Sequence, residues 1–149
     1  MTVRVGAGGT NLEGLNVVGV GVGGRWLADA VSTTSADFLR IIDALPEVVI
    51  GHGSTWSGFK VRGNGFGYLW ERTQTVGLKQ TLAEQQALVA ERPEVFEVQF
   101  TTSSFGWVVV SLEGVELDEL AELTFEAWRL TAPADLVSAF GDQPPDLTG

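Results

Sequence analysis

His52 and the hydroxyl residues beside it are the side chains of this chain that come nearest to a catalytic group. His52 is the only histidine, and it lies two residues before Ser54 in the segment GHGST. A Ser–His–acid triad needs the base within hydrogen-bond reach of the nucleophile and a carboxylate that orients it. The segment does not form a G-x-S-x-G elbow, because its centre is Gly53. We therefore expect His52 to be a surface or turn residue, and we predict a chain without catalytic residues.

Residues that bind metals are scarce or have the wrong spacing. The chain has no cysteine and one histidine, which excludes thiolate zinc sites, iron–sulfur clusters and a histidine-rich metal centre. A group of acidic residues recurs with helical spacing, which is typical of the solvent-facing side of a helix. These residues are Glu116, Asp118, Glu119, Glu122 and Glu126. We therefore predict no metal site.

A glycine-rich segment near the start of the chain raises one cofactor hypothesis. VVGVGVGG satisfies G-x-G-x-x-G through Gly19, Gly21 and Gly24, a spacing that lets the backbone of a dinucleotide fold approach a pyrophosphate. Such a fold needs a crossover helix and then a second strand with an acid about 20 residues later. The Ser/Thr-rich break VSTTS follows instead. We predict no cofactor and treat residues 1–33 as a glycine-rich N-terminal extension.

Charge is unevenly distributed along the chain. The net charge of −10 and the pI near 4.4 argue against non-specific attraction to nucleic-acid phosphates. The segment from Ser54 to Lys79 nevertheless has four basic residues and one acid, a net charge of +3, which leaves −13 for the other residues. The segment that we expect to form strands is therefore positive within an acidic protein.

The basic segment supports a first binding hypothesis. Phe59 and Val61 alternate with basic residues, which predicts a half-buried strand with its charges outward, and the following Gly63–Gly65 predicts a hairpin turn. In this hypothesis the basic strands and the turn bind nucleic acid, with basic side chains on phosphates and a tryptophan stacked on a base. The residues proposed for this role are Lys60, Arg62, Asn64, Lys79 and Trp56.

Trp56 also supports a second hypothesis. It follows GHGST in a predicted loop rather than in an alternating strand, so its ring can line a pocket or plug one end of the core. In this version a groove formed by Trp56, Tyr68 and Trp107 holds a small molecule or a peptide or protein partner. Either version makes the chain a non-catalytic binding module.

Helix and strand patterns alternate after residue 33. In SADFLRIIDAL the apolar residues have the i, i+3, i+4, i+7 spacing of one helix face, and Ser35 can cap the helix. Further helices are predicted over 81–92 and 117–131, and strands over 48–50, 59–62, 66–70, 75–79, 96–101 and 107–112. Phe66, Tyr68 and Trp70 share one strand face, which we expect to lie mostly in the core. The order predicts an α+β fold with two layers, in which helices pack on one face of an antiparallel sheet.

The pattern divides the chain into the extension 1–33, a domain over 34–140 and a polar tail over 141–149. No apolar run approaches the ~20 residues that a membrane-spanning helix needs. The first thirty residues lack the apolar core of a secretory signal. We expect a cytoplasmic protein that does not act on membranes.

Several of these segments together resemble the MmcQ/YjbR-like family of small bacterial α+β domains. The resemblance covers about Phe38 to Val137 with the segments in the same order. The segments are DALPEV, the Ser54–Trp56 loop, FKVRGNGF, VGLK, the helix that ends at Pro93, the strand start at Gly106–Val108 and EAWRLTAPADLV.

The resemblance implies a compact antiparallel sheet with helices on one side, similar to the fold of type III secretion chaperones. Members of the family have been labelled as candidate DNA-binding proteins because their hairpins look like paired wings. The family has no established reaction, so it supplies no catalytic residues. If the wing idea applies here, the contacts fall on Lys60, Arg62, Asn64 and Lys79, with Trp56 near the surface.

Overall fold

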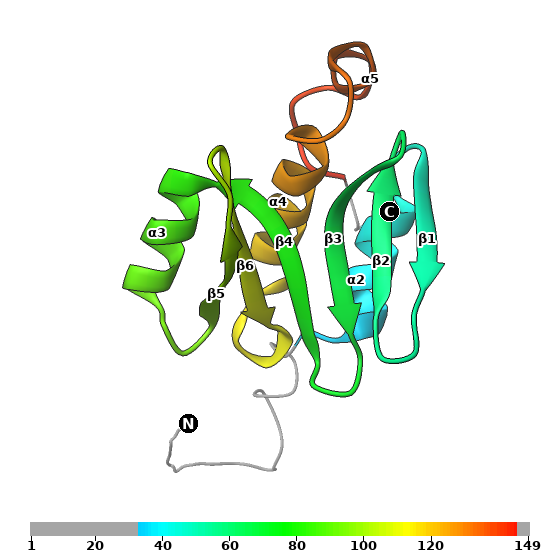
Figure 1. The fold of residues 1–149 in the computed structure, drawn as a ribbon. Coiled ribbons are helices and arrows are strands. Elements are labelled where there is room, and N and C mark those ends of the chain that lie inside the picture. The colour runs from blue at the N-terminus through cyan, green and yellow to red at the C-terminus, as the bar shows by residue number, and fades with distance from the viewer. Residues whose placement is uncertain (1–32, 146–149) are drawn as a thin grey trace. The chain divides into compact units, whose positions relative to one another are not determined.

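The computed structural model describes residues 33–145, and Figure 1 shows a sheet with α2 and α4 behind it. The predicted extension, including its glycine pattern, lies outside the described residues except for Thr33, as does the end of the predicted tail. The elements in chain order are α2 (Ser35–Asp43), β1 (Val48–His52), β2 (Ser57–Val61), β3 (Asn64–Trp70), β4 (Thr75–Thr81), α3 (Leu82–Glu91), β5 (Phe96–Thr101), β6 (Phe105–Ser111), the 3₁₀ turn η2 (Leu112–Gly114), α4 (Leu117–Arg129) and α5 (Ala134–Phe140). The predicted α+β fold is confirmed, and α5 was not predicted.

The six strands form one antiparallel sheet in the order β1-β2-β3-β4-β6-β5. Strands β1 to β4 are joined in sequence by short turns, and each pairs with the next as an antiparallel hairpin. Helix α3 then carries the chain to β5, and β6 returns between β5 and β4. Strands β1 and β5 are consequently the two edges of the sheet.

All three longer helices pack on the same face of the sheet. Phe38 of α2 packs edge-to-face on Phe59 of β2, with 5.4 Å between the ring centroids. Gln80 of β4 donates a 3.0 Å hydrogen bond to a main-chain carbonyl of α4. The side chain of Gln85 in α3 fills the space over Gly106 of β6. Gln80 and Gly106 are paired, so they lie on the same face of the sheet. Phe59 lies on this face too, because it is paired with Gly67, which is paired with Leu78 of β4. The opposite face is therefore free of the described helices.

Local signals explain where the first helix begins and ends. Thr34, rather than the predicted Ser35, caps α2 and forms a capping box with Asp37. The buried stripe of α2 contains Phe38, Ile41 and Ile42, as its periodicity predicts. No helix among the described residues is long and apolar enough to cross a membrane.

The hairpin between β2 and β3 differs from the prediction by one or two residues. Positive φ angles occur at Arg62 (50°) and Gly63 (84°), and Asn64 is already the first residue of β3. Two consecutive residues with positive φ are typical of the type I′ turn, whose twist matches that of the flanking strands. The structure therefore places the turn at Arg62–Gly63 rather than at Gly63–Gly65.

The alternation of β3 is broken, which corrects the expectation that its three aromatic residues share one face in the core. The register between β2 and β3 shifts between Phe59 and Lys60, and this shift leaves Phe66 without a partner. Phe66 is completely buried in the hydrophobic core, whereas Tyr68 and Trp70 are only half-buried. A bulge redirects side chains in this way because it adds one residue to one strand only.

Candidate functional site

The sheet face opposite the helices, called the open face below, carries a cluster of aromatic side chains. The ring of Tyr68 lies 5.9 Å from that of Trp56 in an edge-to-face arrangement and 5.8 Å from that of Trp107. These residues come from the β1–β2 loop, β3 and β6, which are distant in sequence. The structure thus brings together the three residues that were predicted to line a groove.

Two further rings extend this cluster in both directions. Trp70 stacks on Tyr68 with 5.9 Å between centroids, and Phe100 of β5 stacks on Trp107 with 5.0 Å. The outer residues Trp56 and Phe100 are 42% and 41% exposed, while Trp107 is 7% exposed. We call these five residues the aromatic band. Its centre is well packed, and its ends offer ring surface to a ligand.

Glycines beneath the band let two indole rings approach the backbone closely. A Cβ atom at Gly53 would lie 2.4 Å from Cε2 of Trp56, and one at Gly58 would lie 3.1 Å from Cζ3 of the same ring. A Cβ atom at Gly77 would likewise lie 3.1 Å from Cη2 of Trp70. The position of both indoles therefore depends on the absence of side chains in the strand and loop below them.

Both lysines of the basic segment belong to the open face. Lys60 is exposed between the buried residues Phe59 and Val61, so its side chain points away from the core. Lys79 is paired with Trp107 across the sheet, and its Nζ lies 4.0 Å above the ring centroid of Phe105. Partial burial lowers the pKa of the Lys79 ammonium. The two predicted lysines are thus placed along the aromatic band.

Arg62 and Asn64 lie in the hairpin between β2 and β3, and Arg62 is already engaged. Its Nη2 donates a 3.0 Å hydrogen bond to Oε2 of Glu47, and Nε donates to Oε1 of the same carboxylate. This hydrogen bonding lowers the pKa of the Glu47 carboxyl and raises that of Arg62. Asn64 hydrogen-bonds weakly to the carbonyl of Arg62 at 3.5 Å. Binding a phosphate at Arg62 would require the guanidinium to share or leave the Glu47 carboxylate.

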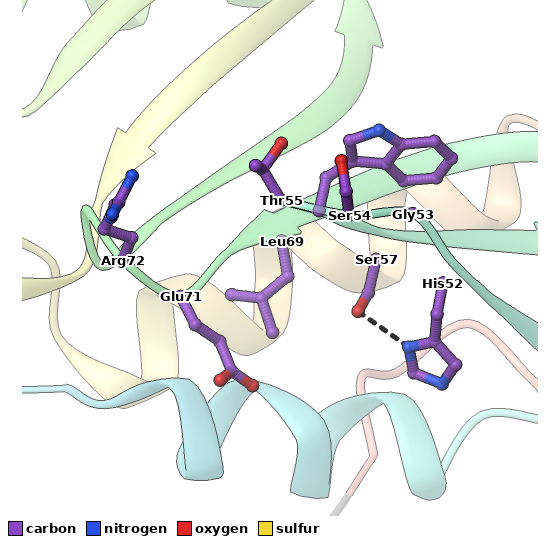
Figure 2. Close-up of a pocket in the computed structure, with 9 residues that line it drawn as sticks. His52, Gly53, Ser54, Thr55, Ser57, Leu69, Glu71 and Arg72 are labelled. Atoms are coloured by element: carbon purple, nitrogen blue, oxygen red, sulfur yellow. Dashed lines mark hydrogen bonds between the residues drawn. The ribbon is translucent and has the colours of Figure 1, made fainter.

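A cavity of about 520 Å³ lies beside Trp56, at the end of the sheet where the β1–β2 loop meets the β3–β4 turn. Figure 2 shows its lining residues, which include three hydroxyl side chains, a carboxylate and a guanidinium. They are His52, Gly53, Ser54, Thr55, Trp56, Ser57, Leu69, Glu71 and Arg72. The lining of the cavity is partly polar and partly apolar, and it adjoins the aromatic band through Trp56.

His52 is exposed, as predicted, and its ring faces a serine other than the one singled out in the sequence. Its Nδ1 lies 3.1 Å from Oγ of Ser57, the first residue of β2 (Figure 2). Because β1 and β2 pair His52 directly with Ser57, strand register explains this contact. Among residues 33–145 no three histidine or acidic side chains are grouped so that they could hold a metal ion.

Trp70 and Phe100 are the members of the band that sequence reasoning did not assign to a site. The sequence predicts Trp70 in the core with Phe66 and indicates no role for Phe100. One signal for the band does exist in the sequence, because Gly58 and Gly77 interrupt strands that otherwise carry larger side chains. Both glycines are paired with Tyr68 in the sheet, and a glycine inside a strand often marks a close approach by another group.

The fold and the site together define a small α+β domain with an aromatic sheet face that the described helices leave uncovered. The family model named YjbR matches residues 43–130, and the chain belongs to the YjbR family. The resemblance read from the sequence is therefore confirmed.

A solved structure and two curated proteins are similar to this chain. The crystal structure of Deinococcus radiodurans protein DR2400, with a DUF419 domain, is 20% identical to this chain and has a TM-score of 0.59. The match covers 66% of this chain and 78% of the chain of DR2400. At that identity the likeness shows the fold alone. Uncharacterized protein Rv2570 of Mycobacterium tuberculosis and Uncharacterized protein Mb2600 of Mycobacterium bovis are each 46% identical over 57 residues. The match covers 36% of this chain and 42% of each relative, so the chain spans less than half of their length.

Proposed function

We propose that this chain is a non-catalytic binding domain that holds single-stranded nucleic acid on the open face of its sheet. The aromatic band carries the proposal, because its outer rings Trp56 and Phe100 are 42% and 41% exposed on a face without described helices, and exposed rings are what bases need for stacking. A duplex hides its bases from such a surface, whereas a single strand can turn its bases outward.

The positions of the lysines support the same ligand. Lys60 and Lys79 point to the open face on either side of β3, which carries Tyr68 in the middle of the band. A strand whose bases stack on the rings runs its phosphates past both ammonium groups. Arg62 is a weaker phosphate ligand, because its guanidinium is paired with Glu47.

The acidic character of the protein determines how such a complex should respond to salt. With a net charge of −10, the protein gains little from long-range attraction, so affinity has to come mainly from stacking, at about 1–3 kcal/mol per base. Two phosphate contacts predict a slope of about −1.4 in a plot of log K against log salt concentration. This slope is shallow compared with that of a protein with many phosphate contacts.

Fluorescence anisotropy with labelled oligothymidylate and a matched duplex tests the proposal. We expect the single strand to bind better than the duplex, and Tyr68→Ala and Lys60→Ala to weaken its binding. Arg129→Gln is the matched control, because it removes one positive charge from α4 on the helix side, where Arg129 pairs with Glu126. If Arg129→Gln and Lys60→Ala weaken binding equally, or if neither nucleic acid binds at low salt, the proposal is wrong.

The cavity beside Trp56 favours a second candidate, a small polar molecule held between the β1–β2 loop and the β3–β4 turn. Its volume of about 520 Å³ falls in the range of small-molecule sites. This candidate predicts binding with weak salt dependence that is lost in Trp56→Ala and unchanged in Lys60→Ala. Screening a small-molecule library by the thermal shift of the protein, followed by these two variants, separates it from the first candidate.

A further inference from the structure

Strand β1 is an edge strand that carries apolar side chains on both of its faces. Ile50 is 43% exposed on the helix side, where it is paired with Phe59, and Val49 is 66% exposed on the open face, where it is paired with Lys60. The sequence of β1, VVIGH, contains no proline, lysine or acid, and its pairing with β2 shows no bulge. Proteins normally protect an edge with such residues, so β1 is an edge suited to pairing with another strand.

A groove runs alongside this edge on the helix side. It has a volume of about 630 Å³ and lies between α2 and β1. Its apolar lining comes from one side of α2, from the connection to β1 and from β1 itself, namely Leu39, Ile42, Leu45, Val48 and Ile50. Because side chains alternate along a strand, a strand added to β1 would direct every second side chain into this groove.

Charge indicates what kind of strand fits there. Of the ionisable groups that line the groove, Arg40 is paired with Asp37 and Glu47 is paired with Arg62. Asp43, the remaining ionisable group of this lining, makes no ion pair with any of residues 33–145. The whole chain has a net charge of −10, which attracts a cationic partner and repels a second copy of this chain.

We propose that β1 and the groove beside α2 form a docking site for an extended peptide of another protein. The peptide adds a strand to the edge of the sheet, places apolar side chains at alternate positions in the groove, and carries net positive charge. Backbone hydrogen bonds supply affinity in this mode of recognition, and the groove supplies sequence preference. The site lies on the edge and the helix side, so it is separate from the aromatic band and independent of the nucleic-acid proposal.

The test uses the full chain and a labelled peptide of about eight residues in which valine and lysine alternate. We expect this peptide to bind, and a peptide of alternating valine and glutamate to bind at least about tenfold more weakly. Ile50→Lys should weaken binding of the first peptide at least about tenfold, because the new ammonium enters the apolar groove. Val49→Lys is the matched control, because it adds the same charge to the same edge on the face away from the groove, and it should weaken binding at least about threefold less than Ile50→Lys.

Two peptides that carry N-methyl groups at alternate residues test the backbone pairing without altering the protein. Methylation of the residues whose N–H groups face β1 should abolish binding, whereas methylation of the other set should be tolerated. Equal effects of the two methylated peptides, or equal effects of Ile50→Lys and Val49→Lys, would overturn the proposal. So would sedimentation data showing that the full chain dimerises and that Ile50→Lys makes it monomeric, because a second copy would then occupy the edge.

Discussion

Replacing Gly53 by alanine should displace Trp56 from the open face while leaving every ring of the aromatic band in the sequence. The new Cβ atom would lie 2.4 Å from Cε2, 2.6 Å from Nε1 and 2.8 Å from Cζ2 of the indole, which is closer than such atoms approach. Gly53 does not have a positive φ, so alanine itself fits the backbone. The steric conflict therefore has to be relieved by movement of the Trp56 side chain.

The expected loss of stability follows from what Trp56 contacts. Its edge-to-face contact with Tyr68 is worth about 0.5–1.5 kcal/mol. Trp56 is 42% exposed, so displacement would return roughly 100 Å² of ring surface to water, with an upper cost of about 2.5 kcal/mol. A glycine-to-alanine change also restricts the unfolded chain, which stabilises by about 0.4–1 kcal/mol. We expect Gly53→Ala to lower the free energy of unfolding by about 1–3 kcal/mol.

Gly51→Ala is the matched control for this experiment. Gly51 lies two residues earlier, and a Cβ atom placed there meets nothing within 4 Å. Both variants restrict the unfolded chain similarly, so the difference between them isolates the contacts of Trp56. Urea unfolding followed by far-ultraviolet circular dichroism should show Gly53→Ala about 2 kcal/mol less stable than Gly51→Ala. Equal stability of the two variants would refute the inferred packing of Trp56 over Gly53.

Three other predictions concern stability. Trp128→Phe removes the 3.1 Å hydrogen bond from the indole Nε1 to the carbonyl of Pro46 and leaves space in the core. Urea unfolding should therefore show that the free energy of unfolding falls by about 2–4 kcal/mol. Arg62 lowers the pKa of Glu47 in the folded state, so the ionised carboxylate stabilises the fold above its ordinary pKa of 4.5. This contribution disappears as the pH falls through the folded pKa. The stability of Glu47→Gln, measured by urea unfolding at a series of acidic pH values, should lack it. Folding also lowers the pKa of Lys79, so the unfolded chain binds this proton more tightly than the folded chain does. The free energy of unfolding should therefore rise with pH toward the ordinary pKa of 10.5. Urea unfolding between about pH 8 and pH 10 should show this rise, and Lys79→Met should remove it.

The sequence predicted well those features that depend on neighbouring residues. The alternation of Phe59 and Val61 with Lys60 correctly identified which side chains of β2 point outward. The grouping of Trp56 with Tyr68 and Trp107 anticipated contacts among three segments of the chain. The assignment within β2 had one consistent interpretation, because burial on one side of a strand requires a period of two.

Other features could not be predicted because they depend on pairing between strands. The sequence predicts that Trp70 lies in the core with Phe66, because alternation in an unbroken strand places both on one face. The register shift opposite Lys60 separates them, and nothing within β3 alone indicates where β2 will shift. Arg62 looked like a free phosphate ligand in the sequence, and its pairing with Glu47 across 15 positions became apparent only in the structure.

The sequence by itself determined the class of this protein: its periodic apolar residues, caps and turns specify helices and strands in a fixed order, and the lack of cysteine with a single histidine removes whole classes of chemistry. The tertiary structure decided which surfaces are available. It placed the helices on one face, left the aromatic band on the other, and made β1 an edge. Such outcomes depend on contacts between residues far apart in the chain, and local propensity carries no information about those contacts.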